Sequence, residues 1–203
     1  MMYIRMESKM YTITIETKEY ESGHKLEIKQ ELYAENPRKS WDMLGTLTMF
    51  TREYEGDEYI PYNDYAEFLE ETEDIYFSLP VYFYDLRSNG ARIHTCKPYD
   101  ANGVIWISKA EAKKEYNWKN RTKKRLEKLE RIFKAELDVL DSYFQGDVFG
   151  FVLEDSAGDI VESVWGFYGM DEIKHIIKEC DDIVASDIED NKEFNVCFPM
   201  VFV

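Results

Sequence analysis

The chain has 203 residues, of which 44% are hydrophobic, and 41 acidic residues against 25 basic ones give it a formal net charge of −16. This length suits a single folded domain, and the hydrophobic content supplies a sizeable core, which argues against global disorder. The negative charge disfavours binding to DNA, RNA and anionic membranes, and it favours cations and basic protein surfaces as partners.

No apolar run reaches the roughly 18–20 residues of a membrane-spanning helix, and the N-terminal stretch "MMYIRMESKM" lacks the apolar centre of a signal peptide. We therefore expect a cytoplasmic protein. The three cysteines, Cys96, Cys180 and Cys197, form an odd set without close spacing. They are expected to be reduced thiols rather than parts of a structural disulfide.

The N-terminal part of the chain predicts a β-hairpin. Ile13 and Ile15 alternate with polar residues in "YTITIETKEY", and Leu26 and Ile28 do the same in "HKLEIKQELY", with "ESG" between the two stretches. A period of two is typical of strands that turn one face to solvent and the other to a core. The stretch "TLTMF" predicts a third, shorter strand.

The stretch "EYEGDEYIPYNDYAEFLEETED", residues 53–74, holds ten carboxylates and no lysine or arginine. Asn63 is the expected N-cap of a helix that runs to about Glu71, with Asp64 in its first turn. One face of this helix collects Tyr62, Tyr65, Phe68, Leu69 and Thr72. The other face collects Glu67, Glu70, Glu71 and Asp74.

Strands and two helices are expected after the acidic stretch. The stretches "IYFSLPVYFYDL", "ARIHTC" and "GVIWIS" predict strands, with a turn at "RSNG" after the first. Ser108 and Glu111 form a capping box for a short helix. A longer helix from Thr122 to about Phe144, with Gly146 at its C′ position, is indicated by apolar residues that recur every three or four positions. They are Leu126, Leu129, Phe133, Leu137, Leu140 and Phe144.

The last third of the chain predicts a hairpin, a helix and a closing strand. "DVFGFVLED" and "IVESVWGFYG" form the hairpin, the helix runs from Asp171 to about Ser186, and "FNVCFPMVFV" is the strand. Hairpins and helices that do not alternate strictly favour an α+β fold with an antiparallel sheet and two main helices packed on it. We expect one domain over residues 1–203, with residues 1–35 as a separate hairpin subdomain in the alternative division.

No motif identifies a catalytic, metal or cofactor site. His94 and Cys96 share one face of a predicted strand, but CxxC and HxxxH spacings are missing, so a strand histidine and a small buried thiol explain them better. The sequence also lacks a nucleophile elbow, a reactive-cysteine signature and the glycine spacing of a phosphate-binding loop. We therefore predict no catalytic residues, no metal and no cofactor.

Charge is distributed unevenly along the chain. Residues 109–134 hold eleven basic residues and four acidic ones, whereas the rest holds 14 basic and 37 acidic residues. A solvated helix face with Glu–Lys pairs explains the basic stretch, and contact with nucleic acid is the alternative. The dense like charge of the acidic stretch costs stability, which indicates that this charge serves something other than folding, such as a binding partner. Solubility alone is the alternative.

Several stretches resemble a family of acidic proteins carried by bacterial phages, plasmids and integrative elements. They are "ENPRKSWDMLGTLTMF", "LPVYFYDLRSNG", "CKPYDANGVIWISKAEAKKEY", "TKKRLEKLERIFKAELDVLDSYFQGDVFGFVLED" and "VESVWGFYG". The similarity spans roughly residues 35–169, and its specific parts are "NPR..WD.LGT" and the pair "GDV.GF" with "WGFYG". The family has no agreed activity, so the resemblance implies a genetic setting rather than a mechanism. This chain departs from it in a short stretch between residues 85 and 104 and in the tail after Asp190.

Phages and plasmids often carry acidic inhibitors of host defence nucleases, of the anti-CRISPR or anti-restriction type. Duplex DNA carries one negative charge per roughly 1.7 Å of its axis, so an array of carboxylates can occupy the same basic channel. The resemblance and the charge together predict such a DNA mimic, a non-enzyme that binds a basic surface of a nucleic-acid-binding defence protein in the host cytoplasm. Direct binding to DNA is not expected.

All ten carboxylates of residues 53–74 are candidate partner-binding residues. They are Glu53, Glu55, Asp57, Glu58, Asp64, Glu67, Glu70, Glu71, Glu73 and Asp74. Tyrosines within the stretch either add contact area for the partner or bury the segment against the protein. Two other functions stay open: a nucleic-acid accessory protein that uses the helix over residues 109–134, and an enzyme of mobile-element metabolism.

Overall fold

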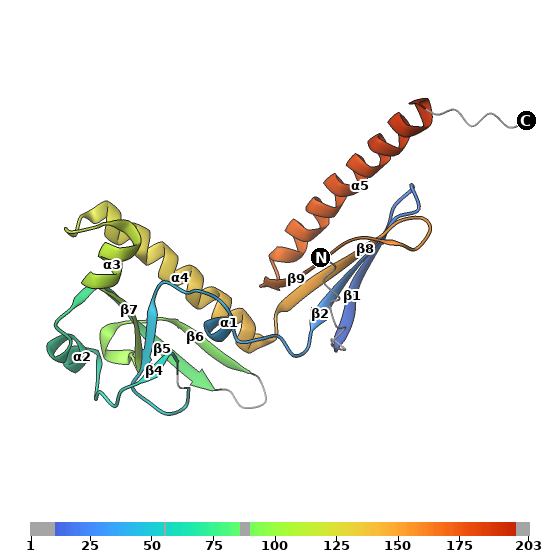
Figure 1. The fold of residues 1–203 in the computed structure, drawn as a ribbon. Helices are drawn as coiled ribbons and strands as arrows, with labels where there is room; N and C mark the ends of the chain where they lie inside the picture. Colours follow the sequence, from blue (N-terminus) through green and yellow to red (C-terminus); the bar gives the residue numbers. More distant parts are fainter. Residues whose placement is uncertain (1–10, 55, 86–89, 198–203) are drawn as a thin grey trace, which may run out of the picture. The chain divides into compact units, whose positions relative to one another are not determined.

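The computed structural model of the chain describes residues 11–54, 56–85 and 90–197, with side chains up to residue 189. It shows a mixed α+β protein, which confirms the predicted class. The strands divide into two sheets, each with one of the two main helices packed on it. Each sheet belongs to a separate compact unit: unit 1 combines the segments before residue 35 and after residue 145, and unit 2 comprises residues 35–145 (Figure 1).

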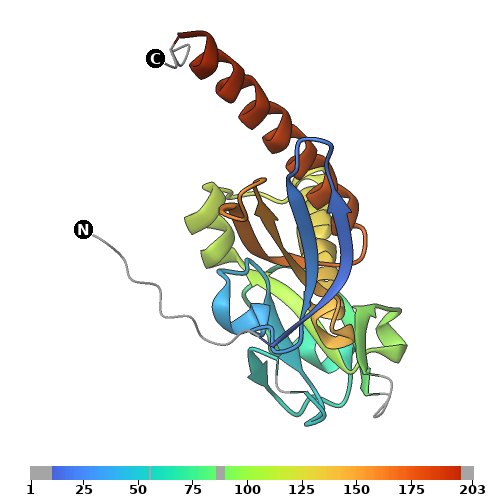
Figure 2. The same ribbon diagram turned by 90° about the vertical axis from the view of Figure 1, so that its right-hand side faces the viewer.

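Unit 1 contains a four-stranded antiparallel sheet and one long helix, α5 (Glu172–Cys197), packed against it (Figure 2). In sheet order the strands are β1 (Thr12–Glu19), β2 (Lys25–Glu31), β8 (Val148–Glu154) and β9 (Ile160–Tyr168). Alternate residues of the two central strands form the core, where Leu26 pairs with Leu153 and Ile28 with Phe151. The helix adds Ile176, Cys180 and Val184 to this core.

The predicted N-terminal hairpin is confirmed, but the side chains of Ile13 and Ile15 are 51% and 41% exposed. Their strand lies at the edge of the sheet, and its register with β2 shifts between Thr14 and Glu16. Both isoleucines therefore lie outside the apolar cluster that β2, β8 and α5 make. The alternation correctly predicts a strand, but the burial of its apolar residues depends on whether α5 covers that strand.

Helix α5 is longer than the sequence predicts. It continues to Cys197, so the predicted closing strand is wrong for residues 194–197, and residues 198–203 lie outside the described part of the chain. The signal in the sequence was ambiguous because a short apolar run is compatible with a strand or with a buried helix turn.

Unit 2 contains a five-stranded sheet in which only β3 and β4 pair in parallel. In sheet order the strands are β4 (Glu58–Tyr59), β3 (Thr46–Met49), β7 (Gly103–Ser108), β5 (Ile75–Asp85) and β6 (Ala91–Thr95). Helix α4 (Lys123–Gln145) packs on one face, as predicted. Of its predicted core residues Leu126 is partly buried, and the buried ones are Leu129, Phe133, Leu137 and Leu140.

The opposite face of this sheet is partly covered by α2 (Tyr65–Glu71). Neighbouring residues of β7 point to opposite faces, so Ile105 belongs to the cluster under α4 and Val104 to a smaller cluster with Phe50 and Phe68. The helix that carries much of the acidic stretch is thus held on the sheet by its aromatic face.

Helix ends follow local signals in the sequence. The predicted capping box of Ser108 and Glu111 opens α3 (Lys109–Tyr116), and Gly146, with a φ of +74°, follows α4 directly. The N-cap of α2 is Asp64 rather than the predicted Asn63. Two short helices complete unit 2: α1 (Pro37–Ser40) and the 3-10 helix η2 (Pro98–Asp100).

Candidate functional site

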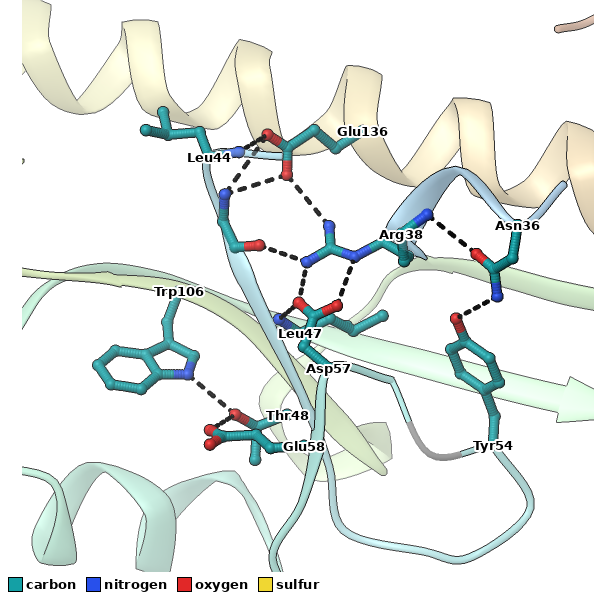
Figure 3. Close-up of polar contacts among 11 residues, drawn as sticks. Asn36, Arg38, Leu44, Leu47, Thr48, Tyr54, Asp57, Glu58, Trp106 and Glu136 are labelled. Carbon is teal, nitrogen blue, oxygen red and sulfur yellow. Dashed lines mark hydrogen bonds and ion pairs between the residues drawn. The ribbon is translucent and has the colours of Figure 1, made fainter. Parts of the chain in front are cut away.

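The first part of the acidic stretch is tied to the protein by a buried arginine. The Arg38 side chain is 3% exposed and forms ion pairs with Asp57 and Glu136 (Figure 3). Its Nε donates to Asp57 Oδ1 at 3.0 Å, and the backbone N–H of Leu47 donates to Asp57 Oδ2 at 2.7 Å. Asp57 therefore stabilises the fold and is a poor candidate for binding a partner.

Glu136 completes this network from helix α4. Its Oε1 accepts the backbone N–H of Leu44 at 2.6 Å, its Oε2 accepts that of Gly45 at 3.1 Å, and the Arg38 guanidinium donates to Oε2 at 3.3 Å. Burial raises the pKa of Glu136, and the two backbone donors and the Arg38 charge oppose that rise. A buried carboxylate with this many donors is satisfied within the protein.

The network explains the stretch "NPR..WD.LGT" in structural terms. The Asn36 side chain accepts the backbone N–H of Arg38 at the start of α1, and Pro37 occupies the first helical position. A Cβ on Gly45 would lie 2.6 Å from Cγ1 of Ile105, so only glycine fits where the chain passes over the sheet. These residues build unit 2, and none of them needs a ligand to explain its presence.

Glu58 is also engaged within the protein. Trp106 Nε1 donates to Thr48 Oγ1 at 2.9 Å, and that hydroxyl donates to Glu58 Oε1 (Figure 3). The chain of donors links β7, β3 and β4 across the sheet. Of the remaining carboxylates in this part, Glu53 is exposed and Glu55 lies outside the described residues.

Two carboxylates at the start of α2 serve the helix itself. Asp64 accepts the backbone N–H groups of Ala66 at 2.9 Å and Glu67 at 3.0 Å. Glu67 in turn accepts the side-chain amide of Asn63 at 2.9 Å. Asp64 thus satisfies donors that the first turn of a helix leaves open, and Glu67 binds the residue before the N-cap, so the charge of both is partly used in the fold.

The end of α2 differs from its start. Four exposed carboxylates surround it, and no ion pair involves any of them among the described residues. We call them the acidic end of α2: Glu70, Glu71, Glu73 and Asp74. Carboxylates near a helix C-terminus face its negative dipole end, where a cation is favoured instead. Lys109, whose side chain reaches this end of the helix, donates to the backbone carbonyl of Glu73 at 2.9 Å rather than to a carboxylate.

Two tyrosines of the acidic stretch, Tyr62 and Tyr65, pack it onto the sheet rather than extend to solvent. Tyr65 is buried and its hydroxyl lies 2.7 Å from Ser78 Oγ, and burial raises its pKa. Tyr62 packs on the rings of Phe50 and Phe68, with centroids 5.7 Å from each. Of the two possibilities that the sequence left open, burial is the one observed for these two tyrosines.

The basic stretch forms an exposed surface on α3, the connection to α4 and the first half of α4. Ten of its eleven basic residues are exposed, and we call this region the basic surface. Two aromatic rings lie within it, Tyr116 and Trp118, stacked with centroids 4.4 Å apart. Lys128 lies 4.3 Å from the Tyr116 centroid and Arg125 lies 5.3 Å from that of Trp118, so both rings already hold cations of the protein.

A serine, a histidine and an aspartate meet in unit 1, which the sequence did not reveal. Ser22 Oγ lies 2.9 Å from His24 Nδ1, and His24 Nε2 lies 3.0 Å from Asp187 Oδ2. The serine contacts Nδ1 instead of the Nε2 that faces the nucleophile in hydrolase triads. Lys18 also bonds Asp181 of α5, so we interpret the contacts as an anchor for the hairpin on α5. The spacing of 163 residues between the partners leaves no signal in the sequence.

The thiols of Cys96 and Cys180 are not activated for nucleophilic chemistry. Burial raises the pKa of Cys96 to about 11 and that of Cys180 to about 12, so both thiols are protonated at neutral pH. Within the described residues, no group of three or more His, Cys, Asp or Glu side chains is placed to hold a metal ion. No helix in the same part of the chain has the length and apolarity needed to cross a membrane.

Comparison of the chain with models of known protein families, with curated proteins and with solved structures gives no match. The resemblance to the mobile-element family therefore stays a prediction. The site is defined by its geometry: five of the ten candidate carboxylates, Glu53 and the acidic end of α2, are exposed and have no assigned role in the fold.

Proposed function

We propose that this protein binds a basic surface of another protein through the acidic end of α2. The observation behind the proposal is that four exposed carboxylates gather at the negative end of a helix, and that no ion pair within the described residues involves any of them. Such an arrangement costs stability in the isolated chain and becomes favourable when a partner supplies the cations.

The partner that fits best is a nuclease of host defence, with the protein acting as a phage- or plasmid-encoded inhibitor in the host cytoplasm. A nuclease channel is lined with the lysine and arginine side chains that contact phosphates. Carboxylates fixed on a folded surface can bind these side chains without offering a bond to cleave. The net charge of −16 adds long-range attraction that speeds encounter and weakens with salt.

Cells with a defined restriction or CRISPR system test the proposal. Expression of the wild-type chain should restore transformation by a plasmid that the system cleaves. A variant with Glu70, Glu71, Glu73 and Asp74 changed to Gln or Asn should lose this effect. The matched control neutralises four exposed carboxylates of unit 1, Glu19, Glu21, Glu179 and Asp182, and should keep it. Equal protection by both variants would show that the acidic end of α2 is not the site.

A second function is favoured by the basic surface, which fits a nucleic-acid accessory protein. Its exposed cations cover two consecutive helices, although local pairs such as Lys134–Glu130 at 2.7 Å neutralise some of them. We expect weak or no duplex binding at about 150 mM salt because the overall field repels DNA. Tight binding there, lost when Lys123, Lys124 and Arg125 are changed to Ala, would favour this second function.

A further inference from the structure

The face of the unit 2 sheet that α2 leaves open carries an aromatic patch. Tyr82 and Tyr84 are two positions apart on β5, so they share a face, and their ring centroids are 5.6 Å apart. His94 of β6 pairs with Tyr82, and its ring centroid lies 6.0 Å from each tyrosine ring. Tyr82 is 37% exposed and His94 is exposed, so the patch faces solvent.

A cup of about 490 Å³ lies beside this patch, at the end of the sheet where β3 stops and β7 starts. Carboxylates, tyrosines and polar side chains line it: Thr51, Glu53, Tyr82, Tyr84, Asp85 and Asn102. Glu53 is one of the five exposed candidate carboxylates without an assigned role in the fold, and it lies in the loop after β3. Asp85 already has an interaction within the protein, so Glu53 is the carboxylate that the cup offers to a ligand, beside the two tyrosines.

The wall of the cup is fixed in place. The Asn102 side chain accepts the backbone N–H of Phe83 at 2.8 Å and donates to the carbonyl of the same residue at 2.6 Å. The backbone pairing of β7 with β5 ends at Gly103 and Val81. Beyond that point, the Asn102 side chain makes the hydrogen bonds to Phe83 that a neighbouring strand would make, and it holds the part of β5 that carries both tyrosines. A preformed site loses little conformational freedom when a ligand binds.

We propose that this cup receives an arginine side chain of the basic partner, a step that rests on the proposed function and adds a second point of contact to it. A planar guanidinium stacks on an aromatic face and donates two hydrogen bonds to a carboxylate at once, which a lysine ammonium does not do. Stacking of an arginine on a tyrosine already occurs within unit 2, where the Arg52 guanidinium lies 5.3 Å from the centroid of the Tyr59 ring. An arginine between Tyr82 and Glu53 meets both kinds of acceptor.

The site differs from the acidic end of α2 in what it selects. The acidic end offers carboxylates alone and attracts any cation, whereas the cup offers ring faces beside a carboxylate. Arginine should therefore be preferred over lysine at the cup. This preference separates the two sites in an experiment.

The test uses the full chain and two capped eight-residue peptides, one of alternating arginine and glycine and one of alternating lysine and glycine. Affinities are measured by calorimetry at low salt, and ring signals of Tyr82 and Tyr84 are followed by NMR. We expect the arginine peptide to bind more tightly and to shift these signals. Changing both tyrosines to Leu should weaken it about five- to thirty-fold, and changing both to Phe should leave it within about two-fold.

Further variants keep the inference and the proposed function apart. Glu53→Gln, an exposed change that leaves the sheet intact, should also weaken the arginine peptide and should reduce its preference over the lysine peptide. If the Leu pair and Glu53→Gln both bind the arginine peptide as wild type does, the cup is not the site, while the acidic end of α2 can still protect cells. Failure of the α2 variant alone to change protection would overturn the proposed function and leave the arginine preference of the cup in place.

Discussion

The change Arg38→Met is a sharp test of how unit 2 uses its acidic residues. Methionine keeps most of the length of the side chain but removes the charge between Asp57 and Glu136. Because Glu136 is buried, it would be left as a charge without its cation, and breaking a buried ion pair costs about 3–5 kcal/mol. Asp57 adds little to this cost because water reaches part of its side chain.

The size of the effect should depend on pH. Burial raises the pKa of Glu136 in the folded state, so its contribution to stability is complete below its ordinary pKa and is lost as the pH rises through the folded value. Arg38 opposes that rise, and removing it should raise the pKa further. The loss of stability in Arg38→Met relative to wild type should therefore be larger at pH 7 than at pH 5.

Urea unfolding followed by tryptophan fluorescence measures the effect in the right unit, because Trp41, Trp106 and Trp118 lie in unit 2 and only Trp165 lies in unit 1. The double variant Arg38→Met/Glu136→Gln removes the stranded charge and should recover about 1–3 kcal/mol of the loss. A single variant within 1 kcal/mol of wild type at pH 7, or a double variant no more stable than the single one, would refute the reasoning.

Three further predictions follow from the packing. Phe133→Ala should cost about 3–5 kcal/mol in urea unfolding, since its ring is fully buried under α4; an unchanged midpoint would place α4 outside the core. Gly45→Ala should cost about 1–3 kcal/mol, because the new methyl would collide with Ile105, and wild-type stability would contradict the close approach. In a Cys197→Ser background, Cys96 and Cys180 should react with a disulfide reagent at pH 8 far more slowly in the folded chain than in urea; equal rates would contradict their raised pKa.

Local signals in the sequence were enough for most elements of the fold, although not for residues 194–197, which continue α5 instead of forming a strand. The three- and four-residue spacing from Leu126 to Phe144 gives α4 almost to the residue, and Ser108 with Glu111 gives the start of α3. Both depend on neighbours within one or two turns of helix. The N-cap of α2 was wrong by one position because Asn63 and Asp64 both have the side chain that an N-cap needs.

The candidate site could be predicted only in part, because the role of a carboxylate depends on distant residues. Asp57 looks the same in the sequence as Glu70, yet one is bound by Arg38, 19 positions away, and the other is exposed without an ion pair among the described residues. The cup beside Tyr82 needs β3, β5 and β7 to be brought together, and nothing in the local pattern of Tyr82 and Tyr84 indicates this.

The order in which the chain is made has a consequence for unit 1. Its sheet joins β2 to β8, so the first two strands leave the ribosome well before their partner exists, whereas unit 2 is complete once residue 145 has emerged. At translation rates of about 5–20 residues per second, the hairpin waits several seconds with Leu26 and Ile28 uncovered. Unit 2 should therefore fold first during synthesis. When chains still attached to the ribosome are treated with protease, residues 35–145 should be protected. The N-terminal hairpin should become protected only after α5 has been made.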